Sequence, residues 1–333
     1  MADLSIYSIV AFILIATELL YFKIANKYSI IDKPNQRSSH IKPTIRGGGI
    51  IFYLGTIVWG VFFNGFSTHL FFLLGLILIG GISFIDDIHS IPNRYRIVFH
   101  LFAIILLLVQ CNELNFSGWT ILFTFLAVIV STGIINAFNF MDGINGMTGA
   151  YSLSVLIPLL YLNKGINFTC DSLIVVTIIS ILVFCYFNFR KKARCFAGDV
   201  GSISIAYIII FIIGSLIVKT HHIFYIMFLA VYGIDSIMTI IHRIYLHENI
   251  FKAHRKHAYQ LLANELKMPH LAVSSIYFII QISINFGLII LEEHKIIYCI
   301  IVLLLLSVIY WVLINRFFYL HIDKQSMNNS ANK

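Results

Sequence analysis

Residues 198–218 read GDVGSISIAYIIIFIIGSLIV, an apolar run with no charged residue after Asp199. The hydrocarbon layer of a bilayer is about 30 Å thick, and a helix rising about 1.5 Å per residue needs roughly 20 apolar residues to cross it. The run is long enough for one crossing. It therefore predicts a membrane-spanning helix near residues 201–218, with Asp199 at its polar entrance.

The rest of the chain repeats this pattern. Of its 333 residues, 59% are apolar and only 11% are charged, and the mean hydropathy is +0.90. A chain of this composition has more apolar surface than the core of a water-soluble protein could bury, so we expect an all-α polytopic membrane protein. Interruptions by charges, Pro and Gly clusters divide the chain into eleven predicted spans, near residues 4–24, 47–63, 69–85, 97–111, 119–138, 147–162, 173–189, 201–218, 222–241, 271–290 and 296–315.

Basic residues are distributed unevenly between the connections. If alternate connections face the same side, one side holds nineteen of the 23 Lys and Arg residues and the other holds three, with Lys23 inside the first span. Connections rich in Lys and Arg stay in the cytoplasm, so the rich side is predicted to be cytoplasmic and the N-terminus to lie outside. We assign the net charge of +8 to topology and to anionic lipids or phosphorylated substrates, and expect no nucleic-acid partner.

The domain organisation is expected to be simple. Residues 1–320 are predicted to form one integral membrane domain, and residues 321–333 a disordered cytoplasmic tail. The start of the chain lacks the basic stretch and cleavage site of a removable signal peptide, so residues 6–24 are read as a retained first span. The cysteines have no paired or metal-ligand spacing and are predicted to be small apolar side chains, at positions Cys111, Cys170, Cys185, Cys195 and Cys299.

Acidic residues stand at the ends of spans on the side rich in Lys and Arg. Asp86 and Asp87 directly follow an apolar run, and adjacent carboxylates at a membrane surface are costly without a cation or a proton. A metal or proton-transfer role competes here with a solvated helix end. Asp199 fits either an N-cap or, beside the other acids on this face, a Mg²⁺ ligand.

A third loop carries amides and a carboxylate without Lys or Arg. Asn136 and Asn139 are three residues apart and share a helix face, which Asp142 extends if the helix continues. Such oxygens suit a hard cation or sugar hydroxyls, with an Asn-capped break between helices as the alternative.

Two further loops carry groups suited to phosphate. Glycines 47–49 precede an apolar run, where backbone N–H groups can approach a phosphate, although a flexible entry to the span explains them equally well. His254 and His257 are three apart on a predicted helix, beside Arg255 and Lys256. This spacing allows zinc ligation but favours phosphate recognition. Acids for a hard metal and bases for phosphates together indicate phosphoryl transfer at the cytoplasmic surface.

These motifs resemble the polyprenyl-phosphate N-acetylhexosamine-1-phosphate transferase family, whose members start peptidoglycan, teichoic acid and O-antigen lipid intermediates. The match runs from Asp32 to Gln260 and contains, in order, Arg37-Ser38-Ser39-His40 with Pro43-Thr44, Asp86-Asp87, Asn136-x-x-Asn139-x-x-Asp142-Gly143, Gly198-Asp199-Val200-Gly201-Ser202 and His254-Arg255-Lys256-His257-Ala258-Tyr259-Gln260. The first and last motifs are most similar to the branch that uses UDP-N-acetylglucosamine or its 6-deoxy relatives and initiates O-antigen in lipopolysaccharide biosynthesis.

The resemblance implies an activity and its reactants. An N-acetylamino sugar 1-phosphate passes from a UDP-sugar to undecaprenyl phosphate, giving a lipid diphosphate sugar and UMP. Because one phosphoanhydride replaces another, the protein has to supply positioning and charge neutralisation. Mg²⁺, with Mn²⁺ as the alternative, is the implied cofactor. The implied location is the bacterial inner membrane, with the active site cytoplasmic, and a homodimer is left open.

The resemblance also implies roles for single residues. Asp86 and Asp87 would handle the lipid phosphate, and Asp142 would lie near the metal or the diphosphate. Asp199 is the principal metal ligand, with Asp142 as the second. Substrate-binding roles fall on Thr44, Asn139, Asn145, Asn188, Phe196, His254, Arg255 and His257, where Phe196 stacks on uracil and the two histidines bind the diphosphate.

Two positions depart from the family pattern. Asn145 stands where many relatives have a second Asp, which removes one negative charge. The segment after Asn188 is one residue longer than usual and lacks the usual proline, so its nucleotide contact rests on a weaker match. The rival hypotheses are a membrane transporter of phosphorylated or anionic substrates, which would place ionisable groups at membrane depth, and a CDP-alcohol phosphotransferase, whose denser aspartate signature is absent.

Overall fold

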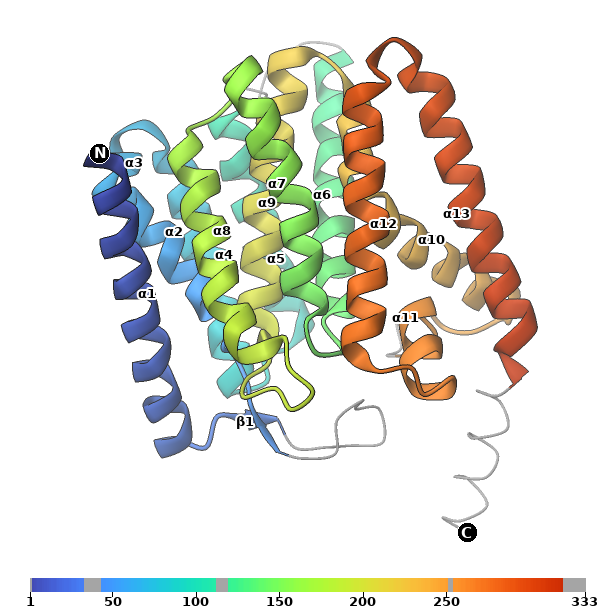
Figure 1. Ribbon diagram of the computed structural model, residues 1–333, viewed down its shortest axis with the longest axis horizontal. Helices are drawn as coiled ribbons and strands as arrows, with labels where there is room; N and C mark the ends of the chain where they lie inside the picture. The colour runs from blue at the N-terminus through green and yellow to red at the C-terminus, as the bar shows by residue number, and fades with distance from the viewer. Residues whose placement is uncertain (1, 33–42, 112–118, 251–253, 320–333) are drawn as a thin grey trace.

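The computed structural model describes residues 2–32, 43–111, 119–250 and 254–319 and shows a bundle of long helices (Figure 1). The predicted tail and the motif at residues 37–40 lie outside the described residues. The helices are α1 (Ala2–Lys27), α2 (Ile50–Phe62), α3 (Gly65–Thr68), α4 (Leu70–Ile88), α5 (Asn93–Gln110), α6 (Trp119–Met141), α7 (Met147–Ile166), α8 (Asp171–Asn188), α9 (Gly198–Thr220), α10 (Ala230–Tyr245), α11 (Ala258–Gln260), α12 (His270–Ile290) and α13 (Lys295–Phe317).

The shorter elements connect these helices. A two-stranded antiparallel sheet pairs β1 (Ile31–Asp32) with β2 (Thr44–Ile45). Two 3₁₀ helices, η1 (Ile223–Leu229) and η3 (Glu292–His294), precede α10 and α13, and a π-helix, η2 (Leu261–Glu265), follows α11.

Each of the eleven predicted spans coincides with a helical segment. Among the described residues, 9 segments are long and apolar enough to cross a membrane. The other two are α2, which has 13 residues, and α7, which carries several polar side chains along its 20 residues. The prediction of an all-α polytopic membrane protein is confirmed.

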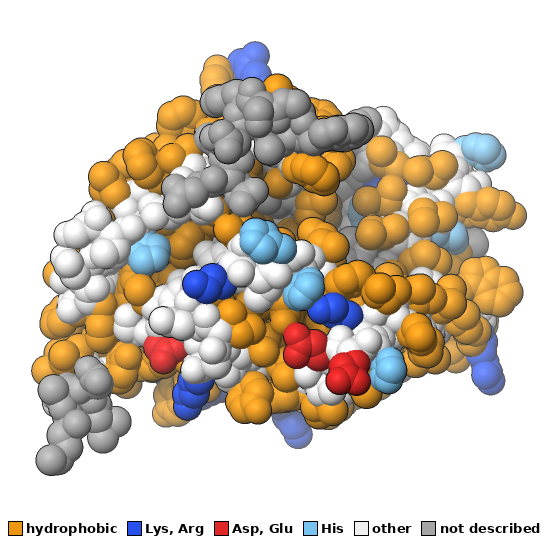
Figure 2. Space-filling view, turned by 90° about the horizontal axis from the view of Figure 1, so that it is seen from above, with side chains coloured by type: hydrophobic (Ala, Val, Ile, Leu, Met, Phe, Trp, Pro, Cys, Tyr) orange, Lys and Arg blue, Asp and Glu red, His pale blue; other side chains and the backbone are white. Residues whose placement is uncertain are grey.

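Polar chemistry is concentrated at one end of the bundle. Helices α4, α6 and α8 end there, α5, α7 and α9 begin there, and β1 and α11 lie at the same lower end in Figure 1. We call it the charged end and define it by Arg46, Asp86, Asp142, Arg190 and Asp199. The opposite end, seen from above in Figure 2, shows mostly hydrophobic and uncharged side chains with a few scattered charges.

Helix α9 is the central element of the bundle. It packs against α2, α4, α6 and α7. In its apolar 18-residue stretch, 83% of the residues are buried inside the protein. A helix that is apolar on all sides is stable only when other helices surround it. Its Tyr207 and Phe211 rings stack on Phe72 of α4, with centroids 5.6 and 4.3 Å apart. Burial of α9 thus places its first turn in the middle of the charged end.

The glycine loop, residues 47–49, allows close contact between the start of α2 and the start of α9. A Cβ atom on Gly49 would lie 2.4 Å from the Cα of Gly201, so only glycine allows this approach. The Gly48 and Gly49 N–H groups donate to the carbonyls of Phe196 and Ala197 at 2.8 and 3.0 Å. Of the two interpretations that the sequence left open, phosphate contact does not hold for these two N–H groups, because protein carbonyls already accept them.

This contact can be tested with a pair of Gly→Ala variants. Gly49→Ala should lower the free energy of unfolding by about 1–3 kcal/mol, because the added methyl group meets backbone atoms that cannot turn aside. Gly81→Ala is the matched control, since a Cβ there meets nothing within 4 Å and alanine favours a helix. Unfolding in mixed micelles, followed by circular dichroism, measures both. Equal stability of the two variants would contradict the packing.

Candidate active site

The carboxylate of Asp87 holds the start of α9. It lies at the end of α4 with its side chain fully buried, and it accepts the backbone N–H groups of Asp199 and Val200, both at 2.9 Å. The first N–H groups of a helix have no partner within the helix and carry partial positive charge, so a carboxylate stabilises them. Gly198 has φ +70°, and a Cβ there would lie 2.6 Å from this carboxylate. Asp87 therefore caps α9 from a neighbouring helix.

Two arginines bind the acids at this point. Arg46 contacts Asp87 at 2.6 Å and Asp199 at 3.3 Å. Arg96 contacts Asp86 at 2.8 Å and Asp199 at 2.9 Å. Burial opposes the charge of Arg46, but the neighbouring Asp87 and Asp199 carboxylates outweigh burial and raise the pKa of its guanidinium. We call these five side chains the carboxylate–guanidinium cluster. The cations that adjacent carboxylates require are supplied here by arginine.

Asp142 lies beside this cluster, just after α6. The Thr148 hydroxyl donates to its carboxylate at 2.5 Å. Burial raises the pKa of Asp142 to about 6, and the charge of Asp87 adds to this effect, while hydrogen bonds from Thr148 and the Gly198 backbone oppose it. The bond to Gly198 places Asp142 next to the first turn of α9.

The predicted divalent cation can be compared with the acids that the structure brings to this end. Within the described ranges, no group of three His, Cys, Asp or Glu side chains is arranged to hold a metal ion. Magnesium, however, is usually held by one or two carboxylates together with substrate phosphates. Asp199 accepts one guanidinium on each oxygen, and a carboxylate has about four lone pairs. Asp199 and Asp142 as ligands of such an ion therefore stay a prediction from the sequence.

The predicted substrate amides are engaged with neighbouring loops. The Asn139 side-chain oxygen accepts the Ser202 hydroxyl at 3.2 Å. The Asn145 amide donates to the Arg190 carbonyl at 2.8 Å. These contacts join the end of α6 and the loop after it to α9 and to the loop after α8.

Asn188 fastens two loops at once. Its side-chain oxygen accepts the Gly146 N–H at 2.7 Å, and its amide donates to the Cys195 carbonyl at 2.8 Å. It lies at the end of α8, and its predicted contact with the nucleotide stays a prediction. The structure adds a positioning role, because both ends of the amide bind backbone groups.

Phe196 and Thr44 lie on the adjoining backbone. The Phe196 N–H donates to the Ile45 carbonyl at 2.8 Å, and Ile45 forms a parallel bridge with Cys195. Thr44 pairs with Asp32 in the two-stranded sheet. The loop before α2 and the loop before α9 therefore share hydrogen bonds at the charged end.

The histidine loop differs from the prediction in its local structure. Residues 254–257 are not helical, and His257 is the N-cap of α11, which starts at Ala258. The rings of His254 and His257 nevertheless lie close, with centroids 5.0 Å apart. Burial and the charge of His257 lower the pKa of His254 to about 4. His254 is therefore neutral near pH 7, and the neighbouring cations are paired with acids, Arg255 with Glu265 at 3.8 Å and Lys256 with Glu248.

Asp235 holds this loop in place, and the motif analysis missed it. Its buried carboxylate accepts the Ala258 N–H at 2.9 Å and the Tyr277 hydroxyl at 2.6 Å, and it lies 3.2 Å from Nδ1 of His257. Fixing Nδ1 leaves Nε2 of His257 buried, with no partner among the described atoms. The signal in the sequence is a single acid inside an apolar span, where ionisable residues are costly.

Comparison with known proteins places the chain in a family. The model of glycosyl transferase family 4 matches residues 69–217. A probable undecaprenyl-phosphate N-acetylglucosaminyl 1-phosphate transferase of Bacillus subtilis is 28% identical over 201 residues, 56% of this chain and 55% of that protein. A phospho-N-acetylmuramoyl-pentapeptide-transferase of Thermotoga petrophila is 30% identical over 210 residues, 58% of this chain and 67% of that protein.

The chain belongs to glycosyl transferase family 4. The family expected from the motifs is thereby confirmed. The region matched to the glycosyl transferase family 4 model contains all four acids of the site, Asp86, Asp87, Asp142 and Asp199, and ends before the histidine loop. The aligned part of the chain spans little more than half the length of the Bacillus relative.

The burial of Asp142 has a consequence for stability that depends on pH. Its pKa of about 6 in the folded state exceeds the ordinary value of 3.8, so the folded protein binds this proton more tightly than the unfolded chain. The free energy of unfolding therefore falls as pH rises from about 4 to about 6, by roughly 3 kcal/mol in total. Asp142→Asn should raise the free energy of unfolding at pH 7.5 and change it little at pH 4.

Unfolding at both pH values in mixed micelles with a metal chelator checks this expectation. Glu293→Gln, at an exposed position of the opposite end, is the control and should be neutral at both. An Asp142→Asn variant that is less stable than the parent at pH 7.5 would show that burial of the ionised carboxylate does not destabilise the folded protein.

Proposed function

We propose that this protein transfers an N-acetylamino sugar 1-phosphate from a UDP-sugar to undecaprenyl phosphate and releases UMP. The observation that carries this proposal is the carboxylate–guanidinium cluster at the start of α9, where four separate parts of the chain meet. Membership of glycosyl transferase family 4 supports the same reaction class.

The reaction exchanges one phosphoanhydride for another. An oxygen of the lipid phosphate attacks the phosphorus that bears the sugar, the new P–O–P bond forms, and the bond to UMP breaks. A phosphate dianion needs little deprotonation near neutral pH. Asp87 is a poor candidate for a base, since its oxygens already accept Arg46 and two backbone N–H groups. We assign it to positioning and assign Asp86 to orienting Arg96.

Charge neutralisation is the main task of the site. Arg46 and Arg96 are held rigidly by three carboxylates, so the cluster itself has no surplus positive charge, and a bound divalent cation would supply the charge that the two phosphorylated reactants require. The neutral imidazole of His254 and the Nε2 of His257 offer hydrogen bonds to the diphosphate. Mg²⁺ or Mn²⁺, held by Asp199 and Asp142, would neutralise the phosphate oxygens when bound.

The setting of the reaction follows from the same arrangement. The charged end would face the cytoplasm of a bacterium, with the protein in the inner membrane, because this end carries the excess of Lys and Arg. The lipid acceptor would enter from the bilayer with its phosphate at that face. The product would start a cell-surface polysaccharide, and donors of the UDP-N-acetylglucosamine type are preferred on the motifs of the first and last loops.

The proposal is tested by incubating purified protein with undecaprenyl phosphate, Mg²⁺ and a panel of UDP-sugars, and by measuring UMP release. We expect release with one preferred N-acetylamino sugar donor. Asp199→Asn should reduce release by about a hundredfold or more, the usual cost of removing one group that stabilises a transition state. Glu293→Gln should leave it unchanged. No UMP from any donor, or full activity in Asp199→Asn, would contradict the proposal.

A further inference from the structure

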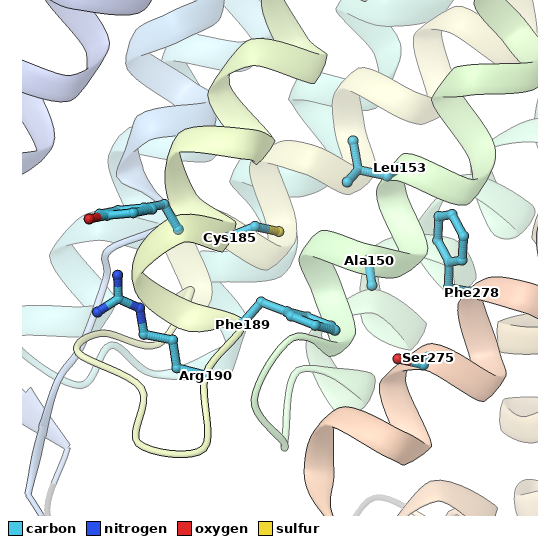
Figure 3. A pocket seen from close by; sticks show the side chains of 8 residues that line it. Ala150, Leu153, Cys185, Phe189, Arg190, Ser275 and Phe278 are labelled. Atoms are coloured by element: carbon cyan, nitrogen blue, oxygen red, sulfur yellow. The ribbon is translucent and has the colours of Figure 1, made fainter.

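A cavity opens between α7, α8 and α12, and none of the five cluster residues lines it. Its volume is about 480 Å³. Figure 3 shows side chains of the three helices around it. Its lining is mostly apolar, with Arg190 and Tyr186 at its α8 side, and includes Ala150, Leu153, Cys185, Phe189, Ser275 and Phe278.

The cavity lies at the charged end of the bundle. Cys185 is in the last turn of α8, Ala150 is in the first turn of α7, and Ser275 and Phe278 fall within the first nine residues of α12. At about 1.5 Å per residue, its depth below the helix ends is at most about 14 Å. Because the hydrocarbon core is about 30 Å thick, this depth stays within one leaflet, which holds a lipid headgroup and its acyl chains.

Arg190 stands at the α8 edge of the cavity, and in Figure 3 its guanidinium points away from the side chains of α7 and α12. Its guanidinium stacks on the Tyr186 ring at 4.6 Å, and in the described part of the chain it has no carboxylate partner. Lys191 and Lys192 follow it in the sequence. An apolar cavity with an uncompensated cation at its mouth is complementary to an amphiphile with an anionic head.

We propose that this cavity binds an anionic phospholipid, with one acyl chain between α7, α8 and α12 and the phosphate on Arg190. The lipid acceptor of the proposed reaction does not suit this position. Its phosphate has to reach Asp86 on α4 and Arg96 on α5. These two helices pack against each other, and α4 also packs against α9. The cavity, in contrast, is lined by residues of α7, α8 and α12.

The cavity wall also supports the candidate active site. The Arg190 carbonyl accepts the Asn145 amide at 2.8 Å. The Phe189 ring lies against Gly146, whose N–H donates to Asn188 at 2.7 Å. A lipid bound on Arg190 and Phe189 therefore holds the segment that positions both asparagines. If the protein has the proposed transferase function, on which this step rests, the bound lipid raises the transfer rate.

The binding test needs no enzyme activity. Purified protein in detergent is mixed with phosphatidylglycerol or phosphatidylcholine, and the retained lipid is measured by native mass spectrometry. We expect phosphatidylglycerol to be retained, and Arg190→Gln to weaken retention about fivefold, as one basic residue contributes about 1 kcal/mol to binding an anionic lipid. Ser275→Leu, which fills the cavity, should weaken retention of the lipid while leaving Arg190 in place.

Lys164→Gln is the matched control. Lys164 lines a second cavity of about 450 Å³ at the opposite ends of α7 and α12, together with Glu292. This variant should retain phosphatidylglycerol like the parent. Equal retention by the parent, Arg190→Gln and Ser275→Leu would overturn the proposal, and so would displacement of phosphatidylglycerol by an equimolar amount of undecaprenyl phosphate.

The functional arm uses vesicles of phosphatidylcholine alone or mixed with phosphatidylglycerol. UMP release by the parent should rise with phosphatidylglycerol, whereas Arg190→Gln should show the same rate in both. A rise of equal size in Arg190→Gln would overturn the coupling. No release in any vesicle would count against the transferase function and leave the binding result to decide the lipid site.

Discussion

The arrangement of the site depends on one carboxylate that meets a helix start and a guanidinium at the same time. Asp87, at the end of α4, accepts two N–H groups of the first turn of α9 and pairs with Arg46 from the loop before α2. Each contact alone leaves a buried charge incompletely compensated. Together they fix three parts of the chain that lie far apart in the sequence.

The membrane setting makes this arrangement necessary. Helix α9 is buried by its neighbours almost along its whole length, so its polar first turn can meet other polar groups only at the charged end. Asp199 follows Gly198 in that turn and is brought to Arg46 and Arg96. A second buried acid, Asp235, fixes the histidine loop in the same way. Acids inside the bundle thus fix the loops that meet at the charged end.

The sequence was informative about the helices and about the acids, and less so about their partners. Apolar runs indicated the spans because helices in a bilayer need a fixed length, and the acids at span ends indicated one polar face. Arg96 and Asp235 were not identified as partners, because pairing depends on how helices rotate and pack. The sequence left phosphate contact and a flexible entry equally open for the glycine loop for the same reason: the acceptors of the Gly48 and Gly49 N–H groups, the Phe196 and Ala197 carbonyls, come from a distant loop.

The most direct test of this account is a double-mutant cycle between Arg46 and Asp87. Free energies of unfolding in mixed micelles are compared for Arg46→Gln, Asp87→Asn and the double variant. The account predicts that the double variant loses less stability than the two single losses combined, by at least about 1 kcal/mol, since the pair acts as a unit. Losses that add within about 0.5 kcal/mol would show that the two side chains act independently and would contradict it.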